Sequence, residues 1–241
     1  MGTLALVRHG QASFGAADYD RLSDRGAEQA RALGVRWAAE PPGAIYTGPM
    51  RRQIDTARMA REAARAAGQE LPEAVELPGL AEMPAFELIA QCLPAVAREH
   101  VELRALVDGT ASGTGRAALF DTAFWKILDG WSQATLDIGE LEPYAAFVER
   151  VHGAIAWIVA RHRGRGERVA AVTSGGPIGV ALRAALGLDG RAMFKLWRVI
   201  RNASVTELMW RSEAGAGADG ELGVLGFNVV DHLPAALQTY R

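Results

Sequence analysis

The stretch that decides the fold reads Leu4-Ala5-Leu6-Val7-Arg8-His9-Gly10-Gln11-Ala12. Its four leading apolar residues predict a strand buried on both faces, as in a parallel sheet covered by helices. Arg8 and His9 follow at the point where burial ends. Because ligands of open parallel sheets bind at the carboxyl ends of the strands, we expect Arg8 and His9 to lie in a ligand crevice. Gly10 lets the backbone turn or approach a ligand closely.

The chain has the composition of an ordinary globular protein. Its 241 residues suffice for one large α/β domain, and we expect a single domain over residues 1–241. Apolar residues make up 49% of the chain and charged residues 22%, which excludes a disordered or fibrous protein. The formal net charge is −2, so we expect neither a nucleic-acid partner nor an anionic membrane partner.

Cysteine content and hydropathy indicate the cytoplasm. Cys92 is the single cysteine, which excludes an intramolecular disulfide framework and a cysteine-based metal site. The amino terminus enters a strand within a few residues, so no signal peptide is expected. No apolar run reaches the roughly 18 residues that are needed to span a bilayer.

Hydrophobic periodicity and turn residues predict the elements that follow the first strand. Strands are expected over residues 44–46, 75–77, 168–173, 204–210 and 221–230, with a Gly-rich loop at 215–220. Helices are expected over residues 24–40, from 49 onward, and over 87–106, 119–136, 143–161 and 174–186. The mainly helical stretch from about 85 to 143 is expected to be a cap insertion that suits a lid, although its aromatic residues are more typical of ordinary helix packing.

Two further polar segments follow predicted strands. Pro49 suits the first turn of a new helix, which puts Arg52 near a helix amino terminus at the carboxyl end of strand 44–46. The segment 174–177, Ser-Gly-Gly-Pro, offers free backbone N–H groups to an anion where another helix begins. By itself Arg52 would belong to a solvated helix face, but together with His9 it indicates a shared pocket.

These pieces form a pocket for a dianion that also carries a nucleophile. Arg8 and Arg52 can bind phosphate oxygens and spread the charge of a transition state, while a neutral His9 imidazole can attack phosphorus in line. The flanking guanidinium charges disfavour imidazolium and keep His9 nucleophilic. Glu82, which follows the third strand, could supply the proton that the leaving alkoxide needs if an apolar or anionic setting holds it protonated.

Motifs at residues 6–11, 22–26, 52–57, 80–82, 172–176 and 202–206 resemble those of the histidine phosphatase superfamily, which includes cofactor-dependent phosphoglycerate mutases and many small-molecule phosphatases. The resemblance implies a three-layer α/β/α sandwich of the phosphoglycerate mutase type, with a mainly parallel sheet and a helical cap insertion. It also implies that His9 is transiently phosphorylated, that Arg8 and Arg52 clamp the phosphate, and that Glu82 is the proton donor. Neither a metal nor a cofactor is expected.

One position departs from the family pattern. Ser174 stands where the family usually has the histidine of a His-Gly-Gly motif. Its hydroxyl can still donate a hydrogen bond to phosphate but contributes no positive charge. We therefore expect Ser174 and Gly175 to bind substrate, with a rate lowered by about 10² to 10³ if the loss resembles that of an oxyanion donor.

The preferred function is hydrolysis of a small phosphorylated metabolite or another phosphomonoester through a phosphohistidine at His9. Sugar phosphates, a nucleotide-like phosphate and a phosphohistidine on a partner protein all stay open as substrates. One alternative is a catalytically impaired phosphate-binding protein. Another is a mutase, although the basic motifs that mutases carry after the acid are missing from residues 83–86. The pattern favours no particular oligomeric state.

A serine hydrolase that uses Ser174 is an alternative from a different class. Residues 172–176 resemble a nucleophile elbow, but Val172 occupies a place that normally belongs to glycine. Asp231 and His232 are too close together for the usual later acid and base. This alternative also leaves Arg8, His9 and Arg52 without a role.

Overall fold

The computed structural model describes residues 1–13, 19–164, 166–210 and 222–240. The chain divides into two compact units, which are described separately below. The sheet unit consists of Met1–Glu82 and Arg150–Arg241, and the helical unit consists of Met83–Glu149. The Gly-rich loop expected at 215–220, and the first residue of the strand expected at 221–230, lie outside the described residues.

The sheet unit is built on six strands in the order β3-β2-β4-β1-β5-β6. Their bounds are β1 Gly2–Arg8, β2 Ala44–Thr47, β3 Ala74–Glu76, β4 Arg168–Thr173, β5 Val205–Trp210 and β6 Gly223–Val229. The four strands from β3 to β1 pair in parallel, whereas β5 and β6 add antiparallel pairs at the far edge. Arg8 pairs with Thr173, so the ends of β1 and β4 lie side by side.

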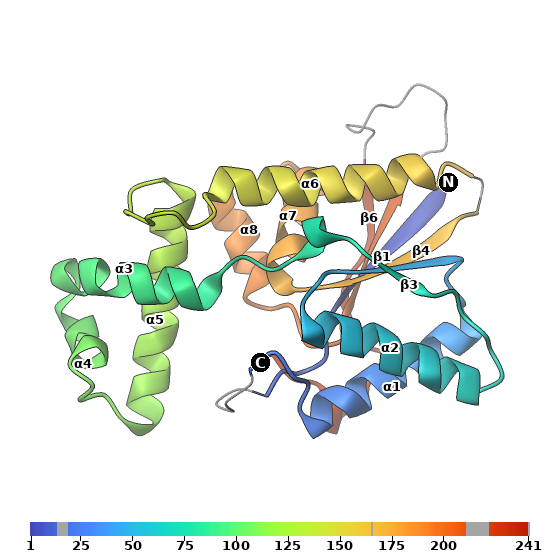
Figure 1. Ribbon diagram of the computed structural model, residues 1–241, viewed down its shortest axis with the longest axis horizontal. Coiled ribbons are helices and arrows are strands. Elements are labelled where there is room, and N and C mark those ends of the chain that lie inside the picture. The colour runs from blue at the N-terminus through green and yellow to red at the C-terminus, as the bar shows by residue number, and fades with distance from the viewer. Residues whose placement is uncertain (14–18, 165, 211–221, 241) are drawn as a thin grey trace. The chain divides into compact units, whose positions relative to one another are not determined.

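Helices cover both faces of the sheet (Figure 1). Helices α1 (Asp24–Ala39) and α2 (Arg51–Ala66) lie on one face, and α7 (Gly175–Leu186) with the part of α6 (Tyr144–Arg161) that belongs to the sheet unit lies on the other. One core cluster lies between the sheet and the first pair of helices, and its larger members are Val7, Leu33, Trp37, Ile45, Leu71, Val172 and Val205. The expected three-layer α/β/α sandwich with a mainly parallel sheet is thereby confirmed.

Most elements of the sheet unit begin and end within two residues of their expected bounds, but one helix was not predicted. Helix α8 (Gly190–Trp197) follows α7 and has only eight residues, too few for a clear period. It begins at Asp189, whose carboxylate accepts a hydrogen bond from the Ala192 N–H at 2.7 Å. Its Phe194 and Trp197 are buried. Short helices of this kind are recognised by their cap rather than by their pattern.

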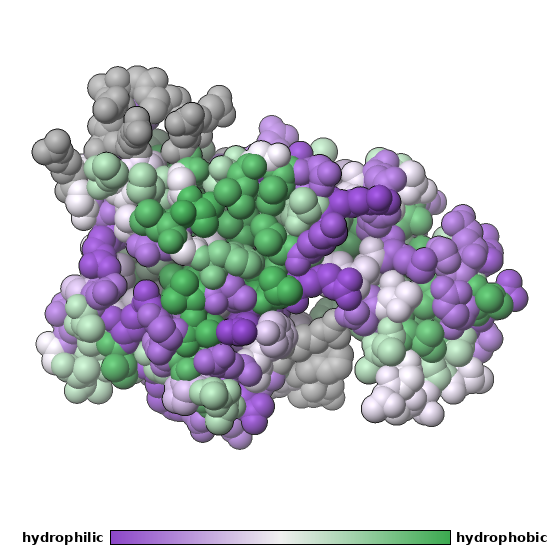
Figure 2. All heavy atoms as spheres, turned by 180° about the vertical axis from the view of Figure 1, so that it is seen from behind, coloured by the Kyte–Doolittle hydropathy of each residue, from purple (hydrophilic) through white to green (hydrophobic). Residues whose placement is uncertain are grey.

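The edge strand β6 is less covered than the others. Every residue of β6 is at least partly exposed, and Leu225 is 55% exposed. The view from behind shows a broad area of hydrophobic surface on that side of the sheet unit (Figure 2).

No helix within the described residues is both long enough and apolar enough to cross a membrane.

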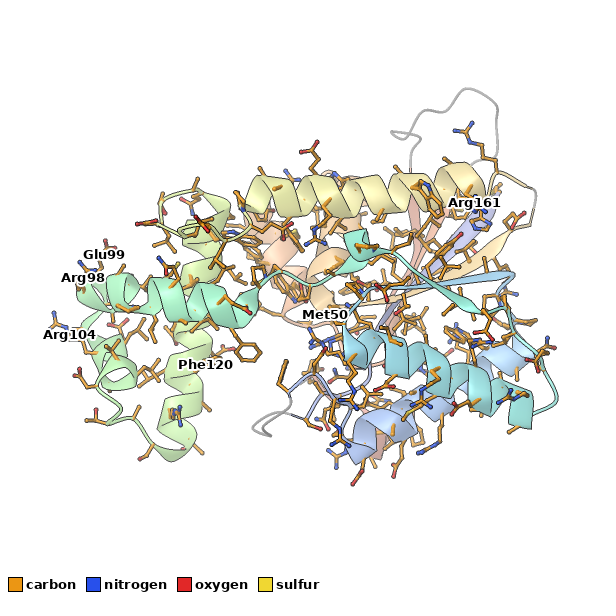
Figure 3. All side chains as sticks on the ribbon, in the orientation of Figure 1. Met50, Arg98, Glu99, Arg104, Phe120 and Arg161 are labelled. Carbon is orange, nitrogen blue, oxygen red and sulfur yellow. The ribbon has the colours of Figure 1, made fainter. Side chains whose placement is uncertain are left out.

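The helical unit is assembled from α3 (Ala85–Glu99), α4 (Arg104–Val107), α5 (Gly113–Ser132) and the first turns of α6. Figure 3 shows Arg98, Glu99 and Arg104 where α3 gives way to α4, and Phe120 on α5. The helix expected over 87–106 is therefore interrupted, and the one expected over 119–136 begins six residues early. The insertion expected over 85–143 falls within this unit, and its function as a cap stays a prediction.

The interior of the helical unit is aromatic. Trp131 is 2% exposed, and its ring lies 5.1 Å from that of Tyr144 and 5.5 Å from that of Phe147. The Trp131 indole N–H donates to the carbonyl of Glu142 at 2.9 Å. This tryptophan packs between helices, as we expected for the aromatic residues of the insertion.

The loop after β1 is pressed against the start of α1, which generates a prediction about stability. A Cβ at residue 26 would lie 2.1 Å from the carbonyl oxygen of Gln11, which is a backbone atom with no freedom to move aside. We expect Gly26→Ala to lower the free energy of unfolding by about 1–3 kcal/mol, measured by urea denaturation. Gly153→Ala in α6 is the control: nothing lies within 4 Å of its Cβ, so it should stabilise by about 0.5–1 kcal/mol. Equal effects of the two substitutions would contradict this account.

Candidate functional site

The site-bearing residues lie where the parallel strands end. His9 follows β1, Ser174 follows β4, and Arg52 lies in the first turn of α2, which follows β2. Glu82 comes shortly after the turn η1 (Pro78–Leu80) that follows β3. All four belong to the sheet unit. The parallel order of these strands is what brings residues from distant parts of the sequence to one edge.

The backbone around His9 is held on several sides. Its N–H donates to the Thr173 carbonyl at 2.9 Å, and its own carbonyl accepts from the Ala203 N–H at 3.2 Å and from the Asn202 side chain at 3.4 Å. The next N–H, that of Gly10, donates to the Thr56 hydroxyl at 3.0 Å. These bonds place the imidazole in a buried position with 5% of the residue exposed.

The two ring nitrogens of His9 have different partners. Nδ1 lies 2.7 Å from the Gly10 carbonyl, which accepts but cannot donate, so the proton is assigned to Nδ1. The Arg52 Nε–H donates to Nε2 at 3.1 Å, so Nε2 carries the lone pair. Burial, and next the charges of Arg52 and Arg8, hold the pKa of His9 well below its usual value, although the bond to Gly10 opposes them. His9 is therefore neutral near pH 7, with the lone pair of the ring on Nε2.

The Arg52 guanidinium is buried and has partners on every side. Besides His9, it contacts the Asp20 carboxylate at 2.6 Å and the Met50 sulfur at 3.0 Å, and it lies over the Tyr19 ring at 5.5 Å. Met50 is at the start of α2 (Figure 3). Asp20 also accepts from the Arg51 N–H at 2.7 Å. The sequence reasoning missed Asp20, since a single acidic residue in a polar loop gives no signal of its partner 32 residues away.

Among the predicted site residues, Arg8 has a guanidinium that contacts backbone carbonyls. Its guanidinium donates to the carbonyl of Tyr240 at 2.9 Å and to the carbonyl of Ile200. Its charge nonetheless contributes to the lowered pKa of His9. That Arg8 clamps a phosphate stays a prediction.

Glu82 is held at the start of α7. Its Oε2 accepts a hydrogen bond from the Gly176 N–H at 3.0 Å, where the unpaired N–H groups and the helix dipole favour a negative charge. The segment before Glu82 is fixed from α6, because the Arg150 guanidinium donates to the carbonyls of Gly79 at 3.0 Å and Ala81 at 3.1 Å. The helix terminus predicted to bind an anion thus binds a carboxylate of the chain itself.

Ser174 is the cap residue of α7 and is fully buried. Its hydroxyl accepts a hydrogen bond from the Gln53 side-chain amide at 2.8 Å. Within the described part of the chain no histidine bonds to this hydroxyl, and Asp231 lies instead beside Arg36 and His232. The serine hydrolase alternative therefore lacks a base at its nucleophile. Sequence reasoning also missed Gln53, which is fully buried beside Arg52.

No cluster of three or more His, Cys, Asp or Glu side chains that could hold a metal ion is found in the ranges that the structure describes. The donors at the site are Arg52, Ser174 and the N–H groups at the start of α7; beside them lie the neutral imidazole of His9 and two separate carboxylates, Asp20 on Arg52 and Glu82 on the Gly176 N–H. Such a set can bind an oxyanion and bring a nucleophilic nitrogen to it.

Comparisons with known proteins identify the family to which most of the chain is similar. The family model described as "Histidine phosphatase superfamily (branch 1)" matches residues 4–100 and 114–217. No curated protein was found to match the sequence.

Solved structures share the fold at low sequence identity. A mycobacterial glucosyl-3-phosphoglycerate phosphatase in complex with VO3 is 20% identical, with a TM-score of 0.66 over 95% of this chain and 100% of the other. The Entamoeba histolytica phosphoserine phosphatase bound to 3-phosphoglyceric acid is 16% identical, with a TM-score of 0.62 over 97% and 100%. A Bacillus anthracis phosphoglycerate mutase is 19% identical, with a TM-score of 0.63 over 94% and 92%.

The lowered pKa of His9 predicts a pH dependence of stability. Below about pH 6.5 the unfolded chain protonates this histidine while the folded protein does not, so stability falls as the pH falls. His9→Gln removes this contribution, which amounts to at most about 1.4 kcal/mol per pH unit. Urea denaturation at several values between about pH 7 and pH 5 should therefore show that the free energy of unfolding falls more steeply with falling pH for the wild type than for His9→Gln. His152 and His232, whose pKa values are also lowered, are present in both proteins and cancel. If the free energies of unfolding of the two proteins change with pH in parallel, the lowered pKa of His9 is contradicted.

Proposed function

The chain belongs to the histidine phosphatase superfamily (branch 1), and on that premise we propose that it hydrolyses a phosphomonoester through a phosphohistidine at His9. The observation that carries the proposal is the contact at 3.1 Å between the Arg52 Nε–H and the unprotonated Nε2 of a buried, neutral His9. A nucleophile and a cation suited to a phosphoryl group lie together there, at the carboxyl edge of the sheet.

In the first step, the Nε2 lone pair of His9 forms a bond to phosphorus while the bond from phosphorus to the ester oxygen breaks. The leaving oxygen takes a proton from the Glu82 carboxyl group, which carries that proton once the arriving phosphoryl dianion has taken its place on the Gly176 N–H. Arg52 turns its donors from Nε2 to the phosphoryl oxygens as the substrate enters. The proton stays on Nδ1, which donates to the Gly10 carbonyl 2.7 Å away, and this hydrogen bond stabilises the positive charge that develops on the ring.

In the second step, a water molecule attacks the phosphorus of the phosphohistidine. The Glu82 carboxylate takes a proton from that water, and the electrons of the nitrogen–phosphorus bond return to Nε2. Inorganic phosphate leaves, and neutral His9 is restored. The two steps together consume one ester and one water and release one alcohol and one phosphate.

The start of α7 links the state of Glu82 to the binding of phosphate. The Gly176 N–H, which now bonds to Glu82 Oε2 at 3.0 Å, is equally suited to a phosphate oxygen. When Glu82 carries a proton, it is a weaker acceptor and the N–H is released to the substrate. In this proposal Arg8, Arg52, Ser174 and Gly175 bind the phosphoryl group, and Glu82 is the acid and then the base.

The substrate class in this proposal is a small phosphorylated metabolite, and the reaction is placed in the cytoplasm. Phosphoserine phosphatase and glucosyl-3-phosphoglycerate phosphatase are among the proteins of similar fold. A protein that binds phosphate but turns it over slowly is the second candidate. It is favoured by one observation: the buried group at position 174 is an uncharged hydroxyl.

Loss of the nucleophile gives the most direct test. After brief mixing with p-nitrophenyl phosphate and a quench at alkaline pH, mass spectrometry should find acid-labile phosphate on the peptide that contains His9. His9→Ala should lose this label and lower kcat by at least about 10³-fold, because the reaction loses its covalent route. His162→Gln is the matched control, since His162 bonds to Tyr46 at 2.8 Å outside the set of groups described above. Equal turnover by wild type and His9→Ala would refute the mechanism.

Chelation tests whether the nucleophile is the imidazole alone. Dialysis against EDTA and transfer to metal-free buffer should leave the rate of hydrolysis unchanged, because His9 takes the place of a metal-activated water and the arginines supply the positive charge. Restoration of a lost rate by added Zn²⁺ or Mg²⁺ would contradict the proposal.

A further inference from the structure

We propose that Gln53 is a positioning residue of this site: its side-chain amide holds the Ser174 hydroxyl as an acceptor, so that the hydroxyl proton is left for a bound phosphoryl group. The inference rests on the proposed function, and it explains how the uncharged Ser174 can direct a hydrogen-bond donor toward the phosphoryl group. Gln53 and Ser174 are separated by 121 residues in sequence, and both are fully buried.

The orientation of the Gln53 amide follows from its partners. Oε1 accepts the Met50 N–H at 3.1 Å, and an N–H can only donate. The other end of the amide must therefore be the NH₂ group, which lies 2.8 Å from Ser174 Oγ and 3.4 Å from the Leu80 carbonyl. A flipped amide would set its oxygen against the carbonyl and its NH₂ against the N–H, so the flip is excluded.

The Ser174 hydroxyl consequently acts as an acceptor toward Gln53, and its own proton needs a different partner. The nearby Leu80 carbonyl is already taken, since it accepts from the Thr173 hydroxyl at 2.7 Å as well as from Gln53. The hydroxyl of Ser174 has no acceptor within the described part of the chain. A buried hydroxyl proton without an acceptor is unfavourable, which suits a donor that is completed by a ligand.

The position of Ser174 makes that ligand the phosphoryl group at His9. Thr173, the residue before it, pairs with Arg8 and accepts the His9 N–H at 2.9 Å, so Ser174 and His9 leave adjacent strands at the same level. Gly175 and Gly176 then begin α7. The serine proton thus joins the backbone N–H groups that begin α7 where β4 ends.

The surroundings are shaped for the Gln53 amide. A Cβ at residue 48 would lie 2.2 Å from Gln53 Oε1 and 2.7 Å from the Leu80 carbonyl, so only glycine leaves room for the side chain where β2 ends. The Gly48 N–H donates to the Val172 carbonyl at 3.0 Å, which fixes that glycine to β4. Gln53 is therefore a built part of the site and not a surface residue that happens to reach it.

A double-mutant cycle tests whether Gln53 acts through Ser174. We compare Gln53→Met, which keeps the length but removes the donor, with Ser174→Ala and with the double variant. The probe is orthovanadate, titrated by calorimetry, with kcat for p-nitrophenyl phosphate as a second readout. Each single substitution should weaken vanadate binding by about 10-fold to 100-fold, the value of one hydrogen bond to a charged group, and the double variant should lose no more than either single one.

The matched control is Gln29→Met. Gln29 is an equally buried glutamine with three hydrogen bonds, to the Gln11 N–H, the Leu237 carbonyl and the Thr239 hydroxyl. Any effect that it has on vanadate binding should multiply with that of Ser174→Ala, because the two residues share no contact. The inference is overturned if the losses of vanadate affinity caused by Gln53→Met and Ser174→Ala multiply in the double variant. It is also overturned if folded Gln53→Met binds vanadate as tightly as the wild type.

Gln53→Glu keeps the test decisive if the methionine variant does not fold. An ionised carboxylate only accepts, so the Ser174 proton would turn toward it and away from the ligand, whereas a protonated carboxyl can donate again. Vanadate affinity relative to wild type should therefore recover as the pH falls from about 8 to about 5.5. A ratio that does not change with pH would overturn the inference, because a purely structural role has no such dependence.

Failure of the inference is distinguishable from failure of the proposed function. A wild-type protein that binds vanadate, carries no acid-labile phosphate and hydrolyses no ester refutes the phosphatase mechanism, while its vanadate titrations still decide the role of Gln53. A wild-type protein that does not bind vanadate overturns both.

Discussion

A neutral imidazole buried against a guanidinium is the constraint on which the rest of the structure depends. His9 and Arg52 are each 5% exposed, and they meet at 3.1 Å through one N–H and one lone pair. Burying a cation requires that its donors find acceptors, and here Asp20 and the ring nitrogen provide them. The same burial lowers the pKa of His9, so the packing of the site also keeps its imidazole neutral, as the proposed mechanism requires.

The short segment after β3 connects the remaining groups. The Leu80 carbonyl accepts from Thr173 at the end of β4 and, at 3.4 Å, from Gln53 in α2, while Arg150 in α6 binds the carbonyls on either side of it. Elements from both faces of the sheet therefore meet at one piece of irregular backbone. The carboxylate of Glu82 follows two residues later, so its place is determined by backbone contacts.

The sequence was sufficient for the elements and the residue types, but not for the contacts between them. The strand expected over 168–173 is β4 residue for residue, and α1 ends within one residue of its expected end, because both have long apolar patterns with clear boundaries. By contrast, the bond from Gln53 to Ser174 and the ion pair of Arg52 with Asp20 join single polar residues from separate elements. Periodicity holds no information about such pairs. They follow from strand order and register, which only the folded chain provides.

The glycines at the strand ends limit how this protein can diversify. A Cβ at Gly10 would lie 2.5 Å from a backbone oxygen, one at Gly48 would lie 2.2 Å from an amide oxygen, and one at Gly175 would lie 2.4 Å from an indole nitrogen. These three positions are therefore restricted to glycine, since almost any side chain there displaces backbone or buried polar groups. Directed evolution of this protein should leave these glycines untouched and randomise side chains elsewhere around the site.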